Sequence, residues 1–306
     1  MNKANVVFIT GTGRCGTNIL KDVLSEHSKV FALPFELRFL TDPDGIIDFY
    51  TTFSSIWSPF IADVKIRRLN KLLKDVSAIS LFNYKDWELE KYFPNFTLNR
   101  INLIKELQDF TFKGTWVRNK EQNYQFFSGP KNQEQLKTIF ANYLQNVIIE
   151  TLNEKNKSIF CTDDTFVFLY AKQILELFPN AKLIYMYREP RDTVISLSHQ
   201  RWCPTDLNKT LYYYKSLINQ WTMIRSNLLT SHYCEISLES LVGDPKLILS
   251  EICEFIGLEF ESELIEKGNL NFTDSHQGRW LEELDELKAE WLTFELNDII
   301  KVLGHE

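Results

Sequence analysis

The order of apolar and polar positions predicts short buried strands that alternate with amphipathic helices. The apolar run at residues 5–10 is long enough for one buried strand, and after it apolar positions recur at helical spacing from Ile19. Similar short runs predict further strands at 29–33, 158–161, 181–187 and 231–236. Strands that alternate with helices in this way predict an α/β fold built on a parallel sheet flanked by helices.

Helical signals occupy the segments between and after these strands. We expect helices at 166–178 and from about 192 to 196, and a long terminal amphipathic helix over 280–303. Asp244 followed by Pro245 is typical of a helix start, because the acid can cap the helix and proline suits its first turn.

The segment 46–155 has a different character. It carries helical periodicity and aromatic clusters, with few strand signals, and its apolar positions between 136 and 148 predict a strong amphipathic helix. No linker or low-complexity stretch separates it from the rest of the chain. We therefore expect a single domain over 1–306, in which 46–155 is a helical insertion that shapes a pocket for a second substrate.

Composition narrows the class of protein. The 306 residues are 44% hydrophobic and 25% charged, as in an ordinary soluble globule, and the net charge of −7 argues against broad nucleic-acid or membrane binding. Five scattered cysteines indicate reduced thiols and a cytoplasmic location. We expect neither a signal peptide nor a membrane span, and no ligand spacing predicts a metal site. Nothing here predicts the oligomeric state.

The glycine-rich stretch between the first strand and the first helix has a phosphate-binding layout. Gly11, Gly13 and Gly16 separate the two elements, and backbone N–H groups converge at such a turn. A nucleoside-triphosphatase loop would need lysine and then serine or threonine after the last glycine. Thr17 and Asn18 stand there instead, so both chemical groups of that loop are missing.

Two other interpretations of the loop remain open at this stage. The glycine spacing fits a dinucleotide-binding fingerprint, and Glu36 lies near the usual distance for a ribose-binding acid. Alternatively, Arg14 inside the loop, with the Thr17 hydroxyl and the Asn18 amide at the helix start, forms a cradle for an anion without a metal.

A second group of residues bears on this choice. Arg188 stands where a strand ends, and Ser196 follows eight residues later in the next helix. A guanidinium and a hydroxyl suit a phosphate, although Arg188 also has local partners in Glu189 and Asp192. If both sites bind anions, a ligand with a phosphate at each end explains the pair.

These motifs together resemble the sulfotransferases that use 3′-phosphoadenosine-5′-phosphosulfate (PAPS). Segment 11–18 resembles their 5′-phosphosulfate loop, with Arg14 at its basic position. Segments 178–184 and 188–196 together resemble the 3′-phosphate motif of the family. Segment 239–245 resembles a further family segment, and 277–280 resembles the late glycine-basic loop. The resemblance spans the chain but is thin over 46–155.

The resemblance implies a P-loop-like fold and transfer of a sulfuryl group from PAPS to a hydroxyl or amine of a small-molecule acceptor. The product would be 3′,5′-adenosine bisphosphate (PAP), and no metal is implied. Glu36 is implied as general base, with His199 as the alternative, and Arg14 would stabilise the transferred group. The implied nucleotide-binding residues are Gly13, Arg14, Cys15, Gly16, Thr17, Asn18, Arg188, Ser196, Gln277, Gly278, Arg279, Trp280 and Tyr233. Of these, we expect Trp280 and Tyr233 to pack near the adenine.

The chain also departs from the family pattern. Cys15 stands where serine is common, and residues 162–165 are acidic where many relatives carry a lysine. Two other functions therefore stay open, an NAD(P)-dependent oxidoreductase and an inactive nucleotide-binding protein. A cluster of acidic residues favours a cationic natural product as the acceptor. The same residues could instead form a solvated acidic surface, in which case they say nothing about the acceptor. They are Asp42, Asp44, Asp48, Asp63, Asp163 and Asp164.

Overall fold

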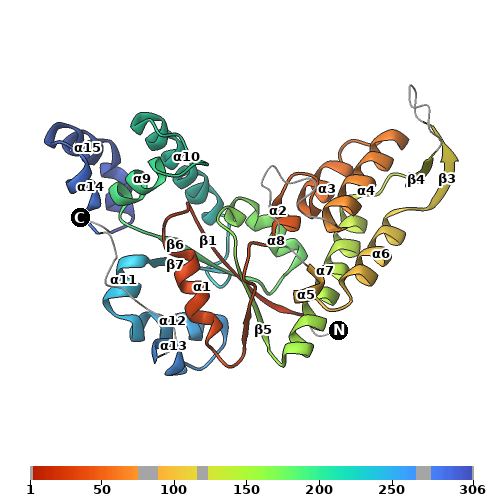
Figure 1. Cartoon of the computed structure of the whole chain (residues 1–306), viewed down its shortest axis with the longest axis horizontal. Coiled ribbons are helices and arrows are strands. Elements are labelled where there is room, and N and C mark those ends of the chain that lie inside the picture. The colour runs from red at the N-terminus through yellow and green to blue at the C-terminus, as the bar shows by residue number, and fades with distance from the viewer. Residues whose placement is uncertain (1–2, 75–88, 116–122, 267–276, 305–306) are drawn as a thin grey trace. The chain divides into compact units, whose positions relative to one another are not determined.

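The computed structural model describes residues 3–74, 89–115, 123–266 and 277–304 (Figure 1). The chain divides into two compact units. The first comprises residues 1–5, 37–160 and 172–180, and the second comprises 6–36, 161–171 and 181–306. The whole of the predicted insertion at 46–155 therefore belongs to the first unit.

A five-stranded sheet forms the centre of the second unit. Its strands are β1 (Asn5–Gly11), β2 (Val30–Ala32), β5 (Ile159–Asp163), β6 (Lys182–Tyr187) and β7 (Tyr233–Ser237), and their order is β2-β5-β1-β6-β7 (Figure 1). Strand β6 pairs in parallel with both β1 and β7. The apolar run of β1 is buried from Val6 onward, which indicates that both faces of this central strand are covered. The prediction of an α/β fold with a parallel sheet is confirmed.

The register of the sheet brings three strand ends to one edge. Gly11 at the end of β1 lies opposite Met186, and Tyr187 at the end of β6 lies opposite Ser237. The segments that follow β1, β6 and β7 therefore leave the sheet at the same edge. In open α/β sheets, ligands bind at this edge.

The helices of the second unit pack around the sheet. They are α1 (Thr17–Ser25), α9 (Pro190–Ser198), α10 (Leu207–Arg225), α11 (Leu238–Gly243), α12 (Pro245–Ile256), α13 (Glu263–Glu266), α14 (Arg279–Glu283) and α15 (Glu286–Val302). Asp244 caps α12 through the N–H of Leu247, as predicted. The ring of Tyr185 on β6 stacks on Trp221 of α10 at 4.3 Å. This buried pair fixes α10 against the sheet.

Two helices differ from their predicted extent. The predicted helix over 280–303 is divided into α14 and α15. The backbone of Leu284 is extended, which ends α14, and Asp285 then caps α15 by accepting the N–H of Lys288. The predicted helix over 166–178 begins as a 3₁₀ turn (Val167–Tyr170) and becomes helical only in α8 (Ala171–Leu177). In both, a local turn replaces the regular helix that apolar spacing suggested.

The first unit is mainly helical, as predicted for 46–155. Its elements are α2 (Arg38–Thr41), α3 (Ile46–Phe53), α4 (Pro59–Lys74), α5 (Leu89–Tyr92), α6 (Phe96–Leu107), α7 (Gln133–Lys155) and most of α8, with a hairpin of β3 (Phe110–Gly114) and β4 (Asn123–Phe127). Sequence reasoning missed the hairpin because β3 is mostly exposed and has no buried alternation. Asp63 of α4 accepts the N–H of Phe126 and so holds β4. In the described part of the chain, no helix is long and apolar enough to cross a membrane.

Candidate functional site

The loop after β1 has a left-handed backbone at three positions. The φ angles are 86° at Gly13, 60° at Arg14 and 88° at Gly16. A Cβ at Gly13 would lie 2.8 Å from the Trp202 ring, and one at Gly16 would lie 2.7 Å from Leu238. Left-handed turns of this kind direct backbone N–H groups into a concavity that binds anions. Glycine is therefore required at both positions for this loop to form.

The helix that follows the loop begins without a side-chain cap. Gly16 is the N-cap residue of α1 and has no side chain that accepts from the first turn. Thr17 is buried and Asn18 is exposed at that turn. The first N–H groups of a helix carry partial positive charge and favour an anion. The helix start thus continues the anion-binding concavity of the loop.

The side chain of Cys15 points into the protein. Its thiol is fully buried, and burial raises its pKa to about 11, although backbone N–H groups of the loop, that of Gly13 first, oppose this. A thiol with such a pKa stays protonated and unreactive at neutral pH. Cys15 therefore offers the loop its backbone rather than a reactive sulfur.

The structure brings the loop and the second predicted group together. Arg14 Nε donates to Ser196 Oγ at 3.0 Å, although the two residues are 182 positions apart. The Arg14 side chain is exposed, whereas Ser196 on α9 is buried. A guanidinium from the loop and a hydroxyl from α9 thus meet at the carboxyl edge of the sheet.

Arg188 is buried just beyond β6 and is held by Asp192. The Arg188 Nη2 atom lies 3.6 Å from Asp192 Oδ2, an ion pair too long for a hydrogen bond. The same carboxylate accepts the N–H of Gly278 at 2.9 Å and the N–H of Trp280 at 3.1 Å. The local pairing considered for Arg188 is therefore present, and Asp192 also holds the 277–280 turn beside it.

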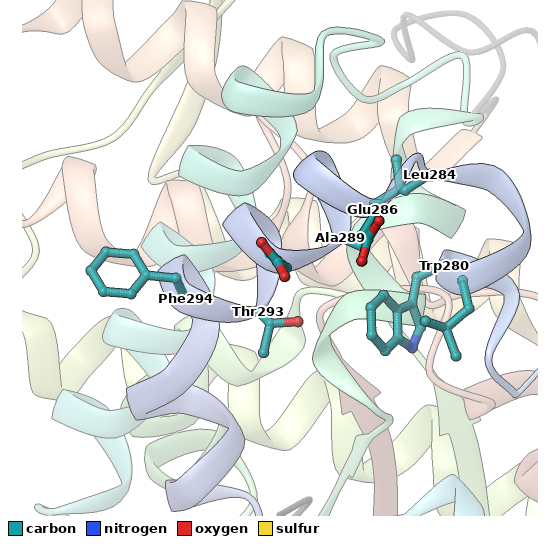
Figure 2. A pocket seen from close by; sticks show the side chains of 8 residues that line it. Trp280, Leu284, Glu286, Ala289, Thr293 and Phe294 are labelled. Atoms are coloured by element: carbon teal, nitrogen blue, oxygen red, sulfur yellow. The ribbon is translucent and has the colours of Figure 1, made fainter.

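The other residues of that turn face different partners. Gln277 is exposed, and Arg279 pairs with Glu283. The Trp280 ring packs on the Arg191 guanidinium at 4.2 Å. The same ring lines a groove of about 640 Å³ along α14 and α15, together with Thr293 and Phe294 of α15 (Figure 2). The groove is no anion site, because none of its described lining residues is a cation and two are glutamates.

Glu36 lies beside the glycine loop. Its Oε1 atom accepts the backbone N–H of Thr165 at 3.2 Å and the Thr165 hydroxyl at 2.9 Å. The Thr165 methyl group would lie 3.2 Å from a Cβ at Gly13. The alternative base, His199, is half exposed and its Nε2 lies 2.6 Å from Glu283. Of the two candidates, Glu36 is the one linked to the loop.

One of the two acidic residues in segment 162–165 has a cationic partner. Lys21 Nζ lies 3.0 Å from Asp163 Oδ1, and both side chains are nearly buried. Burial raises the pKa of Asp163, Lys21 opposes this, and the charge of Glu36 adds to the rise. Sequence reasoning missed Lys21, although its place one helical turn after Thr17 puts both on one face of α1.

The acidic residues thought to attract a cationic acceptor are mostly paired within the chain. In the first unit, four of them lie close to a basic side chain, Asp42 to Arg38 (2.6 Å), Asp44 to Arg68 (3.4 Å), Asp48 to Lys65 (3.0 Å) and Asp63 to Arg67 (2.9 Å). Asp164 accepts the N–H of Phe166. Their charges are thus largely balanced internally.

Tyr233 is not brought together with the other predicted residues. It starts β7, and its ring packs edge-on against Trp221 at 5.5 Å. Since a strand rises about 3.3 Å per residue, Tyr233 lies about 13 Å from Ser237 and the loop edge. An aromatic residue that does lie beside the loop is Trp202, whose ring would be 2.8 Å from a Cβ at Gly13.

Comparison with known proteins identifies the family and supports the fold. The model of a family described as the sulfotransferase family matches residues 84–262, more than half of the chain. None of the curated proteins matches the sequence. The sulfotransferase domain of the Synechococcus PCC 7002 olefin synthase is 15% identical, with a TM-score of 0.52 over 97% of this chain and 95% of that domain. The sulfotransferase domain of the curacin biosynthetic pathway is 17% identical, with a TM-score of 0.52 over 100% and 99%.

At identities this low, the two structures support the fold alone. The match to the family model is what assigns the chain to a family. The matched segment contains β5, β6, Arg188 and Ser196, while the glycine loop lies before it. The loop is joined to that segment by the contact between Arg14 and Ser196. The chain belongs to the sulfotransferase family.

Proposed function

We propose that this sulfotransferase moves a sulfuryl group from PAPS to a hydroxyl or amine of a small molecule. The observation that carries the proposal is the 3.0 Å hydrogen bond from Arg14 to Ser196. It joins two anion-binding groups from distant parts of the sequence at one edge of the sheet. A donor with phosphate groups at both ends of its nucleotide needs such a pair.

The residues present fit the charge distribution of this donor. The loop at 11–16 and the start of α1 suit the 5′-phosphosulfate end, because both offer backbone N–H groups. Arg188 and Ser196 suit the 3′-phosphate, since a guanidinium and a hydroxyl both donate to phosphate oxygens. Asp192 orients Arg188 for this role and holds the 277–280 turn next to it.

The chemistry is an in-line displacement at sulfur. The bond between sulfur and the 5′-phosphate oxygen breaks, a bond between sulfur and the acceptor oxygen or nitrogen forms, and the acceptor proton passes to Glu36. Arg14 and the loop N–H groups would stabilise the negative charge that develops on the oxygens. General-base assistance of this kind is worth about 10²–10⁴-fold in rate.

The class of acceptor stays broad in this proposal. The paired carboxylates of the first unit remove the reason for preferring a cationic acceptor. A natural-product acceptor stays a prediction, to be tested by a screen of alcohols, phenols and amines with PAPS as donor.

The sheet order argues against the dinucleotide interpretation of the loop. In a dinucleotide-binding fold the second strand lies next to the first, which puts its acidic residue close to the glycine loop. Here β5 lies between β2 and β1. Glu36 also contacts Thr165 after β5, so its place near the loop has a different origin.

Calorimetric titration with PAP tests the proposal, with NADH and ATP–magnesium titrated in parallel. We expect binding in the low-micromolar range or tighter for PAP alone. Arg188→Ala should weaken PAP binding about 30-fold, since a hydrogen bond to a charged group contributes about 2 kcal/mol. Arg68→Ala is the matched control, because Arg68 is an exposed arginine of the first unit. Binding of NADH without PAP would refute the proposal, and PAP binding without turnover on any acceptor would indicate an inactive nucleotide-binding protein.

A further inference from the structure

Thr165 makes two hydrogen bonds to a single carboxylate oxygen. Its backbone N–H and its hydroxyl both donate to Glu36 Oε1, at 3.2 and 2.9 Å. Two donors from one residue fix the carboxylate in position and restrict its rotation. An ionised carboxylate only accepts hydrogen bonds, so both donors match the charged form that a general base needs.

The same residue is tied to the end of β1. The Thr165 carbonyl accepts the N–H of Gly11 and the hydroxyl of Thr10, both at 3.2 Å. Its methyl group faces Gly13, where an added Cβ would approach it to 3.2 Å. Thr165 therefore connects the carboxylate of Glu36 to the loop that we propose for the donor.

Charged groups also lie near Glu36. Asp163 lies close enough for the two carboxylates to interact electrostatically, and Lys21 pairs with Asp163 at 3.0 Å. This pair adds a repelling carboxylate and a compensating cation to the surroundings of Glu36. Thr165 donates both of its hydrogen bonds to the same oxygen of the Glu36 carboxylate and so orients it.

We infer that Thr165 is a positioning residue, which holds the Glu36 carboxylate at a fixed place relative to the glycine loop. The inference rests on the proposed role of Glu36 as general base. Thr165 itself touches neither donor nor acceptor in this role. Its hydroxyl acts through Glu36, and its methyl group keeps the spacing to Gly13.

Two substitutions separate these functions of the side chain. Thr165→Val keeps the shape and removes the hydroxyl, whereas Thr165→Ser keeps the hydroxyl and removes the methyl group. We expect Thr165→Val to lower kcat about 10- to 100-fold, the effect of one hydrogen bond to a charged group, with donor KM nearly unchanged. The acidic limb of its pH–kcat profile should move to higher pH. Thr165→Ser should keep most of kcat and the wild-type profile.

A double-mutant cycle with Glu36→Gln tests whether the hydroxyl acts through Glu36. If it does, Thr165→Val should have little further effect in the Glu36→Gln background, because both changes remove the same contribution. PAP affinity, measured by calorimetry, should be equal in all variants.

The possible failures are distinguishable. Full activity of Glu36→Gln, or no turnover by the wild-type protein, would remove the base and with it the proposed mechanism. A large loss in Glu36→Gln together with additive losses in the double variant would overturn the inference alone. So would a loss of PAP affinity in Thr165→Val equal to its loss of kcat, since Thr165 would then support the loop rather than the base.

Discussion

Replacing Arg14 by glycine should make the loop easier to fold and poorer at binding the donor. Arg14 has a φ of 60°, and a non-glycine residue in the left-handed region costs about 1–2 kcal/mol. Glycine avoids that cost, but it loses about 0.5–1 kcal/mol more conformational entropy than alanine. Arg14→Gly should therefore be about 1 kcal/mol more stable than Arg14→Ala. The side chain is exposed, so neither change opens a cavity.

Both variants should bind PAP more weakly than the wild-type protein. The Arg14 guanidinium would give the bound anion a charge-assisted hydrogen bond, worth about 1.5–3 kcal/mol. Both Arg14→Gly and Arg14→Ala should then bind PAP about 10- to 100-fold more weakly. The equal loss in the two variants is expected because both lack the same guanidinium.

Urea unfolding measures the first effect and calorimetric titration of PAP the second. The two variants are matched controls for each other, because they differ in backbone freedom and share the missing charge. An Arg14→Gly variant less stable than Arg14→Ala would refute the reasoning from backbone strain. PAP affinity within threefold of wild type in both variants would refute the placement of Arg14 at the anion.

Three further predictions concern buried groups. Asp192→Asn should weaken PAP binding about 10-fold by loosening Arg188, and faster limited proteolysis near 277–280 should accompany it; an unchanged digestion pattern would contradict the anchoring role. Cys15, with a pKa of about 11, should resist iodoacetamide at pH 8 until the protein is unfolded, as followed by mass spectrometry, and rapid native labelling would contradict its burial. Lys21→Met should cost about 3–5 kcal/mol in urea unfolding, since it leaves the Asp163 carboxylate buried without its cation. Burial raises the pKa of Asp163 above its unfolded value, so protonation favours the folded state and this variant should regain stability as the pH falls toward about 4; a uniform loss at all pH values would contradict the pairing.

The strands and the glycine loop were predictable because their signals are local. The segments 6–9 and 183–187 consist of apolar and aromatic residues without interruption, and glycine or proline follows each within a few residues. The hairpin of β3 and β4 lacked that signal, because β3 buries little of its surface. The break before α15 depends on one capping residue, Asp285, inside a stretch that keeps its helical periodicity.

Contacts between distant segments were not predictable from the sequence. The ion pair of Lys21 with Asp163 and the link of Glu36 to Thr165 join segments whose neighbourhood depends on strand order. The distance of Tyr233 from the loop could have been predicted in part. A residue at the start of a parallel strand lies far from the carboxyl ends of the strands, where ligands bind. Trp202 gave no such signal, because it lies in a turn between two helices.

The basic residues near the carboxyl ends of the strands differ in their burial and in their partners. Lys21 and Arg188 are buried, and each lies close to a carboxylate. Arg14 has a strained backbone, and its Nε donates to the neutral hydroxyl of Ser196. Among the described residues, its guanidinium forms no ion pair with a carboxylate. Strained residues of this kind persist where surrounding structure enforces them, and they cluster at ligand sites. A chain with a net charge of −7 has many carboxylates that could pair with Arg14, so the lack of such a partner in the described part of the chain agrees with the role proposed for this guanidinium at an anionic donor.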